Sequence, residues 1–175
     1  MKKILVLFLT LILCFSITAC VLPDGFPEKK DFEKETDTSE EELEALVFGL
    51  NETAAFSELA FTATEMKESS GADYFKPEEG NVFVGIHFTI ENTSDEEQSV
   101  SSLLMFDGYV DDVKCDYSFN AACAFDDGTL DGDVAPGKKL VGWYAVEVPA
   151  DWSTIELEVQ DKYLSKQSAK FVFEK

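Results

Sequence analysis

One histidine and four cysteines are the scarcest residues from which this chain could build a catalytic or metal site. His87 would have to serve any serine–histidine–aspartate arrangement, yet the sequence contains no Gly-x-Ser-x-Gly segment. A zinc site needs further histidines or a spaced set of cysteines. The 35 acidic residues are too numerous for one glycosidase-like pair to be singled out. We therefore assign no catalytic residue and expect no cofactor.

The acidic segment DDGTLDGD at 126–133 could in principle bind calcium. Calcium takes six to eight hard oxygens, which carboxylates and backbone carbonyls supply. However, the segment lacks the alternating spacing and closing glutamate of the common calcium loop. A glycine-rich turn accounts for it without a metal, so we predict no metal site. The weak candidates for one are Asp126, Asp127, Asp131 and Asp133.

Cys115 and Cys123 lie symmetrically about Phe119. A hairpin with a three-residue loop at 118–120 would pair Tyr117 with Ala121 and place the two cysteines directly opposite each other. Cross-strand partners have Cα atoms about 4.5–5.5 Å apart, a range that a disulfide accepts. We expect a Cys115–Cys123 disulfide, and the alternative is two reduced cysteines in the core.

The N-terminus has the composition of an export signal. Lys2 and Lys3 precede an apolar run at 4–17, and small residues then lead to Cys20. The run is shorter than the roughly 20 residues that a permanent transmembrane helix needs. We therefore favour a signal peptide over a transmembrane anchor.

The four residues Ile-Thr-Ala-Cys at 17–20 resemble the bacterial lipobox. The resemblance implies cleavage before Cys20 and attachment of a diacylglyceryl group to its thiol. Two or three acyl chains are enough for stable attachment to a membrane. The alternative is ordinary secretion, with a cysteine near the cleavage site by chance. We expect a protein held on the extracytoplasmic face of the cell membrane through Cys20.

The charge of the chain excludes some partners. Its net charge is −21 and all 14 basic residues are lysines. Without the signal, 12 lysines remain against 35 acidic residues, so the mature protein carries −23. Nucleic acid and anionic head groups are repelled by such a chain. Solubility at a cell surface explains the charge, and attraction of a cationic ligand is the alternative.

The chain divides into three parts. Residues 1–19 form the signal, residues 20–44 form a flexible acidic stalk, and residues 45–175 form a globular domain. Within the stalk, Ser39 and Glu42 have the spacing of a capping box, which permits a short helix there.

Residues 45–175 show the period of two that is typical of strands, most clearly in NVFVGIHFTIEN at 81–92. His87 falls on the opposite face from the apolar Val84, Ile86 and Phe88. Many strands without intervening helices predict an all-β antiparallel sandwich. The expected strands are 59–64, 82–90, 99–106, 113–119, 139–148, 154–159 and 169–174.

Three segments in order resemble the immunoglobulin-like domain of unknown function found in lipoproteins of Gram-positive bacteria. They are GLNETAAFSELAFTATEMKES (49–69), VFVGIHFTIENTSDEE (82–97) and LDGDVAPGKKLVGWYAVEVP (130–149). The residues that fit the family pattern are Asn92, Pro136, Gly137, Gly142 and Pro149. The resemblance implies an immunoglobulin-like β-sandwich on an extracellular stalk and brings no active-site residues.

Two classes of function remain. We expect a membrane-tethered, non-enzymatic binding or interaction module, because loops and edge strands on a rigid sandwich suit recognition. Its partner would be a protein or another component of the cell envelope. The alternative is a metal- or carboxylate-dependent surface enzyme that acts on wall polymers.

Overall fold

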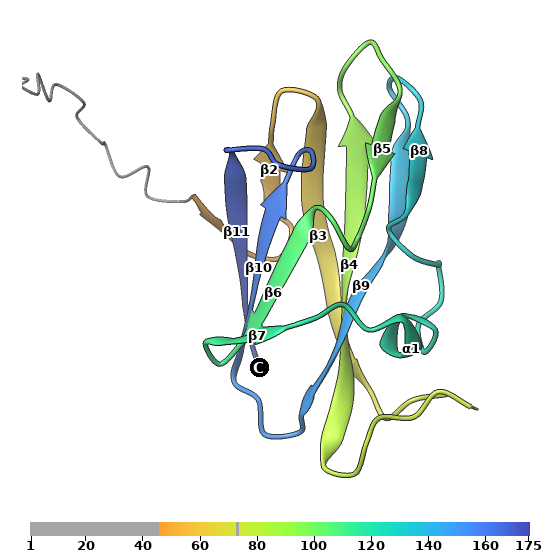
Figure 1. Ribbon diagram of the computed structural model, residues 1–175, viewed down its shortest axis with the longest axis vertical. Coiled ribbons are helices and arrows are strands. Elements are labelled where there is room, and N and C mark those ends of the chain that lie inside the picture. The colour runs from red at the N-terminus through yellow and green to blue at the C-terminus, as the bar shows by residue number, and fades with distance from the viewer. Residues whose placement is uncertain (1–45, 73) are drawn as a thin grey trace, which may run out of the picture. The chain divides into compact units, whose positions relative to one another are not determined.

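The computed structural model describes residues 46–72 and 74–175, and their regular structure is almost wholly β (Figure 1). The elements are β1 (Val47–Phe48), β2 (Thr53–Ala55), β3 (Leu59–Ser69), β4 (Asn81–Asn92), β5 (Gln98–Val100), β6 (Phe106–Val110), β7 (Val113–Cys115), α1 (Phe119–Ala122), β8 (Gly132–Val134), β9 (Lys139–Pro149), β10 (Thr154–Gln160) and β11 (Ser168–Glu174).

The strands form two sheets that pack face to face. One sheet has the order β2-β3-β4-β9 and the other has the order β1-β11-β10-β6-β7. All pairs are antiparallel except β1 and β11, which run parallel. Strands β5 and β8 form a separate two-stranded ladder beside the ends of β4 and β9 (Figure 1). The expected all-β sandwich is confirmed.

Strand β4 is central to the four-stranded sheet, and its sequence explains why. Its even-numbered apolar residues, from Val84 to Ile90, are fully buried in the core, while His87 and Thr89 lie on the other face and are half-buried. It pairs with β3 on one side and with β9 along its whole length on the other. A strand with one apolar face and neighbours on both sides has a strongly specified register.

The core joins the two sheets through aromatic rings. Phe88 of β4 meets Phe106 of β6 edge-on at 5.4 Å and Phe171 of β11 at 5.3 Å between ring centroids. Tyr144 of β9 stacks on Phe106 at 5.1 Å. All four rings are buried. Edge-to-face and offset pairs are the preferred geometries of aromatic contacts, so these rings set how the sheets sit on each other.

Two of the expected strands are wrong in extent. The run at 99–106 is strand only to Val100, because the chain then turns and Ser102 binds the carboxylate of Asp131 through its backbone N–H and its hydroxyl. The run at 113–119 stops at Cys115, since Ser118 begins the helix α1 instead. Apolar residues continue in both runs, which is why periodicity alone overestimates these strands.

The remaining expected strands are confirmed by β3, β4, β9, β10 and β11. The expected signal, stalk and capping box at residues 1–44, together with Cys20, lie outside the described residues. In the part that the structure describes, no helix combines the length and apolar character needed to cross a bilayer.

Candidate functional site

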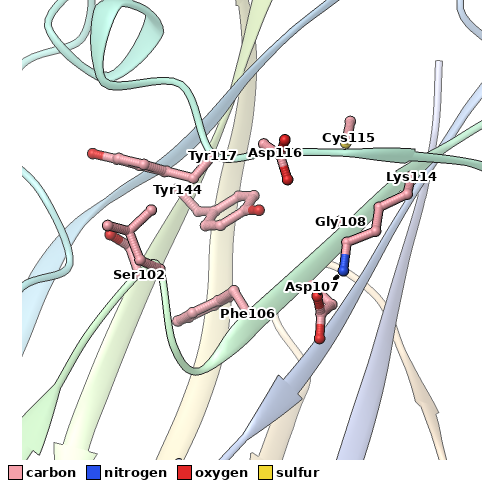
Figure 2. Close-up of a pocket in the computed structure, with 10 residues that line it drawn as sticks. Ser102, Phe106, Asp107, Gly108, Lys114, Cys115, Asp116, Tyr117 and Tyr144 are labelled. Atoms are coloured by element: carbon pink, nitrogen blue, oxygen red, sulfur yellow. Dashed lines mark hydrogen bonds and ion pairs between the residues drawn. The ribbon is translucent and has the colours of Figure 1, made fainter.

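A cleft opens at the edge of the five-stranded sheet where β6 and β7 separate (Figure 2). The two strands pair over three positions only, from Gly108 opposite Cys115 to Val110 opposite Val113. Beyond Cys115 the chain leaves the sheet toward α1, whereas β6 continues back to Phe106. The cleft has a volume of about 230 Å³. It is lined by Ser102, Leu103, Phe106, Asp107, Gly108, Lys114, Cys115, Asp116, Tyr117 and Tyr144.

Aromatic rings and one glycine shape the cleft. The ring of Tyr144 lies between Tyr117 and β6 (Figure 2), at 5.6 Å from the Tyr117 ring. A Cβ at Gly108 would come within 3.0 Å of Cys115 Sγ and 3.1 Å of the Tyr144 hydroxyl. These distances are shorter than ordinary van der Waals contact, so the lack of a side chain at position 108 lets both groups approach the strand.

The charges around the cleft are mostly negative. Lys114 forms an ion pair with Asp107 at 2.6 Å, and this contact raises the pKa of the lysine. Burial, followed by a set of nearby groups that includes Asp107 and Asp116, raises the pKa of the Tyr144 hydroxyl well above its usual range. The cleft is therefore a partly apolar site in a negative field.

Cys115 and Cys123 do not form the expected hairpin pair. Both are free thiols. Cys115 lies opposite Gly108 of β6, and the expected loop at 118–120 instead enters α1, with Cys123 at its C-terminal cap. The side chain of Ser118 accepts a hydrogen bond from Ala121 N, which favours the helical turn over a hairpin. The disulfide prediction is thus wrong, because capping by Ser118 replaces the turn on which it depended.

Cys115 should react slowly with alkylating reagents. Burial, and to a lesser degree the charge of Asp116, raises the pKa of its thiol to about 11. At pH 7.5 a smaller fraction of this thiol is ionised, which slows the reaction, while a thiolate of higher pKa is more nucleophilic, which partly offsets the loss. We expect the alkylation of Cys115 at pH 7.5 to be about 30-fold slower than that of an ordinary cysteine. A Cys123→Ser variant isolates Cys115, and a short cysteine peptide is the reference. The rate should rise with pH up to about 11; equal rates for protein and peptide would contradict the buried thiol.

His87 lies on the outer face of the four-stranded sheet, as predicted, and it holds a β-bulge. The pairing of β3 with β4 shifts between Ala63 and Glu65, which leaves Thr64 unpaired. The Thr64 hydroxyl lies 2.6 Å from His87 Nδ1 and 3.1 Å from the His87 backbone oxygen. A β-bulge changes the direction of a side chain, and here it turns the Thr64 side chain toward His87 of the neighbouring strand.

Thr64, His87 and Asp127 have the residue types of a nucleophile, a base and an acid. Their distances, however, are those of a β-bulge stabilised by Thr64 and His87. The Thr64 hydroxyl donates to the His87 backbone oxygen and also forms a hydrogen bond with Nδ1, whose donor or acceptor role is set by the tautomer. On the other side of the ring, Nε2 is 3.7 Å from Asp127 Oδ2, which is too long for a hydrogen bond. The Trp143 ring packs against the imidazole at 4.7 Å. The contacts of His87 with Thr64 and Trp143 therefore indicate a structural role for this residue.

The carboxylates of the acidic loop at 126–133 contact different parts of the domain. Asp127 faces His87, Asp131 binds Ser102, and Asp133 accepts a hydrogen bond from Ser99 at 2.6 Å. Among the described residues, no three His, Cys, Asp or Glu side chains are grouped so that they could hold a metal ion. The side chains of Asp127, Asp131 and Asp133 thus face different parts of the domain.

The same loop is attached to the edge of β9. Trp143 N–H donates to Gly128 O at 3.0 Å, and a Cβ at Gly142 would lie 2.8 Å from Thr129 O. A glycine inside a strand often marks such a close approach, and at Gly142 the approaching segment is this loop.

Comparison with known families gives one match. The family model of a domain of unknown function, DUF4352, covers residues 48–170. The chain belongs to the DUF4352 family. No curated protein matches it in sequence. The predicted resemblance to a lipoprotein domain of unknown function is confirmed.

Solved structures share the fold of this DUF4352 chain at low sequence identity. The ycdA protein of Bacillus subtilis, described as a "putative lipoprotein", is 13% identical with a TM-score of 0.58 over 70% of this chain and 38% of that one. An uncharacterised β-sandwich protein of Clostridium difficile is 18% identical with a TM-score of 0.53, over 79% and 99%. A secreted protein of Mycobacterium tuberculosis, MPT63, is 11% identical with a TM-score of 0.50, over 75% and 98%. The present chain thus spans little more than a third of the ycdA protein.

Among the residues that line the cleft in this DUF4352 domain, the sequence singled out Cys115, as a disulfide partner, but gave no indication of a binding site. Phe106 and Tyr144 belong to apolar runs that predict strands, and Tyr117 lies in an irregular segment. The one usable signal is Gly108, because a glycine inside a strand marks a bulge or a close approach of other groups.

Proposed function

We propose that this protein is an extracytoplasmic lipoprotein, anchored through Cys20, and that its sandwich domain is a non-enzymatic binding module. The anchor rests on the lipobox-like sequence at 17–20. The fold shared with the ycdA protein and with a secreted mycobacterial protein is consistent with a place outside the cytoplasm.

The observation that carries the binding role is the cleft between β6 and β7. It is open to solvent, walled by aromatic rings, and bounded by charged groups at its mouth. Concave sites with apolar walls and a few polar groups are the usual form of ligand sites. The sandwich holds these walls rigidly, since Phe106 and Tyr144 belong to the buried core.

Narrowing the cleft should weaken binding while leaving the fold intact. We expect a soluble chain of residues 21–175 to bind isolated cell envelopes saturably in a sedimentation assay, without hydrolysing wall polymers. Gly108→Ala places a methyl group against Cys115 Sγ and the Tyr144 hydroxyl, so affinity should fall about tenfold, or 1.4 kcal/mol.

Gly49→Ala is the matched control, because a Cβ there meets only Glu52 Oε2, at 3.7 Å. Thermal unfolding of both variants shows whether the fold is kept. Unchanged binding by folded Gly108→Ala would contradict a role for the cleft. Hydrolysis that disappears in a His87→Ala variant would favour the surface-enzyme alternative.

A further inference from the structure

The described domain contains two places where a lysine ammonium group lies over an aromatic ring beside a carboxylate. Lys67 Nζ is 5.4 Å from the centroid of the Trp143 ring and 3.0 Å from Glu65. Lys175 Nζ is 5.3 Å from the Trp152 ring and 3.0 Å from Glu68. An aromatic face and a carboxylate both attract an ammonium group.

The cleft presents a similar combination, with Lys114 as the one lysine among the residues that line it. The half-buried Tyr117 supplies an aromatic ring, and Asp107 and Asp116 supply the carboxylates. Asp107 is already paired with Lys114 at 2.6 Å. Among the described residues, none of the lysine ammonium groups forms an ion pair with Asp116. The exposed carboxylate of Asp116 thus remains without a lysine partner in a cleft that Tyr117 also lines.

The negative field inside the cleft favours a cation. The charge of Asp116 contributes, after burial, to the raised pKa of the Cys115 thiol. A third carboxylate, Asp131, binds Ser102 at the edge of the cleft. The net charge of −21 attracts cations to the whole domain at long range.

The size of the cleft limits the ligand. Its volume is about 230 Å³. Pockets for drug-sized molecules usually have about 300–1,000 Å³. The cleft therefore admits a head group with a few methylenes, and a chain of sugar rings does not fit.

We propose that the cleft binds a primary ammonium group at the end of a short alkyl chain, as in a lysine side chain, with Asp116 as its counter-ion and the half-buried Tyr117 as its aromatic wall. The methylenes would contact the Tyr117 ring while the ammonium group faces the carboxylate, above the buried Tyr144. This inference rests on the binding role proposed above and specifies its ligand.

Amide chemical shifts of the soluble chain 21–175 test the proposal, because they report both affinity and location. The probes are N-acetyl-lysine-methylamide, its neutral norleucine analogue, and the anionic glutamate analogue. We expect the lysine derivative to shift the amides of Gly108, Asp116 and Tyr117 with a Kd on the order of 1 mM. The norleucine and glutamate analogues should bind at least tenfold more weakly, and added salt should weaken lysine binding.

Two further comparisons sharpen the test. Asp116→Asn should reduce affinity for the lysine derivative about tenfold, whereas Asp95→Asn, an exposed carboxylate in the turn after β4, should leave it unchanged. The free diamine 1,5-diaminopentane distinguishes a soluble amine from a lysine held in a peptide. Tighter binding of the lysine derivative than of the diamine indicates the peptide source, and the reverse indicates a free amine.

Each outcome separates this inference from the binding role on which it rests. Equal shifts with the neutral and lysine probes, or no effect of Asp116→Asn, would overturn the ammonium site while leaving the cleft as a binding site. If none of the probes shifts the cleft amides, the ammonium proposal falls; if envelope binding also survives Gly108→Ala, the binding role of the cleft falls with it.

Discussion

Replacing Cys20 with serine should remove fatty-acid labelling of the protein almost completely and shift it from the membrane fraction to the soluble fraction. The thiol is the proposed site of the diacylglyceryl group, and the serine hydroxyl does not replace it in this reaction. A single acyl chain already gives measurable membrane binding, and two or three make it stable. Loss of the lipid is therefore a large effect. Labelled palmitate and cell fractionation measure it.

Cys14→Ser is the matched control, because Cys14 lies within the apolar run of the signal and should be cut away. This variant should keep its label and its place in the membrane. A Cys20→Ser chain that stays in the membrane without being cut would show that the apolar segment is itself an anchor. Labelling that persists in Cys20→Ser would place the lipid on another residue.

Asn92→Ala should lower the free energy of unfolding by about 3 kcal/mol, which for a domain of this size corresponds to a fall in Tm of roughly 10 °C. Asn92 is fully buried at the end of β4. Its Nδ2 donates to Glu96 O and Val134 O, both at 2.7 Å. Its Oδ1 accepts hydrogen bonds from Ser94 N at 2.9 Å and Ser94 Oγ at 2.8 Å. Alanine removes all four hydrogen bonds, and the one to Val134 O lies in a buried site.

Denaturant unfolding of Asn92→Ala and of Asn120→Ala measures the effect. Asn120 lies exposed in α1, so its replacement removes a side chain of the same chemistry without removing a buried network. We expect Asn120→Ala to change stability by less than about 0.5 kcal/mol. Similar losses in both variants would show that the Asn92 network does not hold the end of β4 to β8.

The part of the fold that could be predicted is the part that each strand specifies within itself. In β10 the apolar residues alternate along the strand, and the buried residues follow the same alternation. In β4 the alternation holds from Ile86 onward, whereas Phe83 on the other face is also buried, against the alanines of α1. The expected strand at 113–119 failed because a competing local interaction, the cap at Ser118, lies among apolar residues that fit a strand equally well.

The candidate site was much less accessible to prediction than the fold. Tyr117 and Tyr144 are 27 positions apart in the chain, and their rings meet only because β9 passes beneath the segment that follows β7 (Figure 2). The aspartates at 126–133 were visible as a cluster in the sequence, yet their side chains face three different elements. A local group of charged residues does not determine where its carboxylates point.

By itself, the sequence determined the excess of negative charge and the positions of the long strands, and it is the basis of the proposed export signal. These properties depend on residues close together along the chain, such as the period of two or a short apolar run. Only the tertiary structure decided that Cys115 remains a thiol, that Asn92 joins β4 to β8, and that a cleft opens beside Tyr144. Each of these depends on the register and separation of strands distant in sequence, and the burial of side chains from both sheets in one core sets that register.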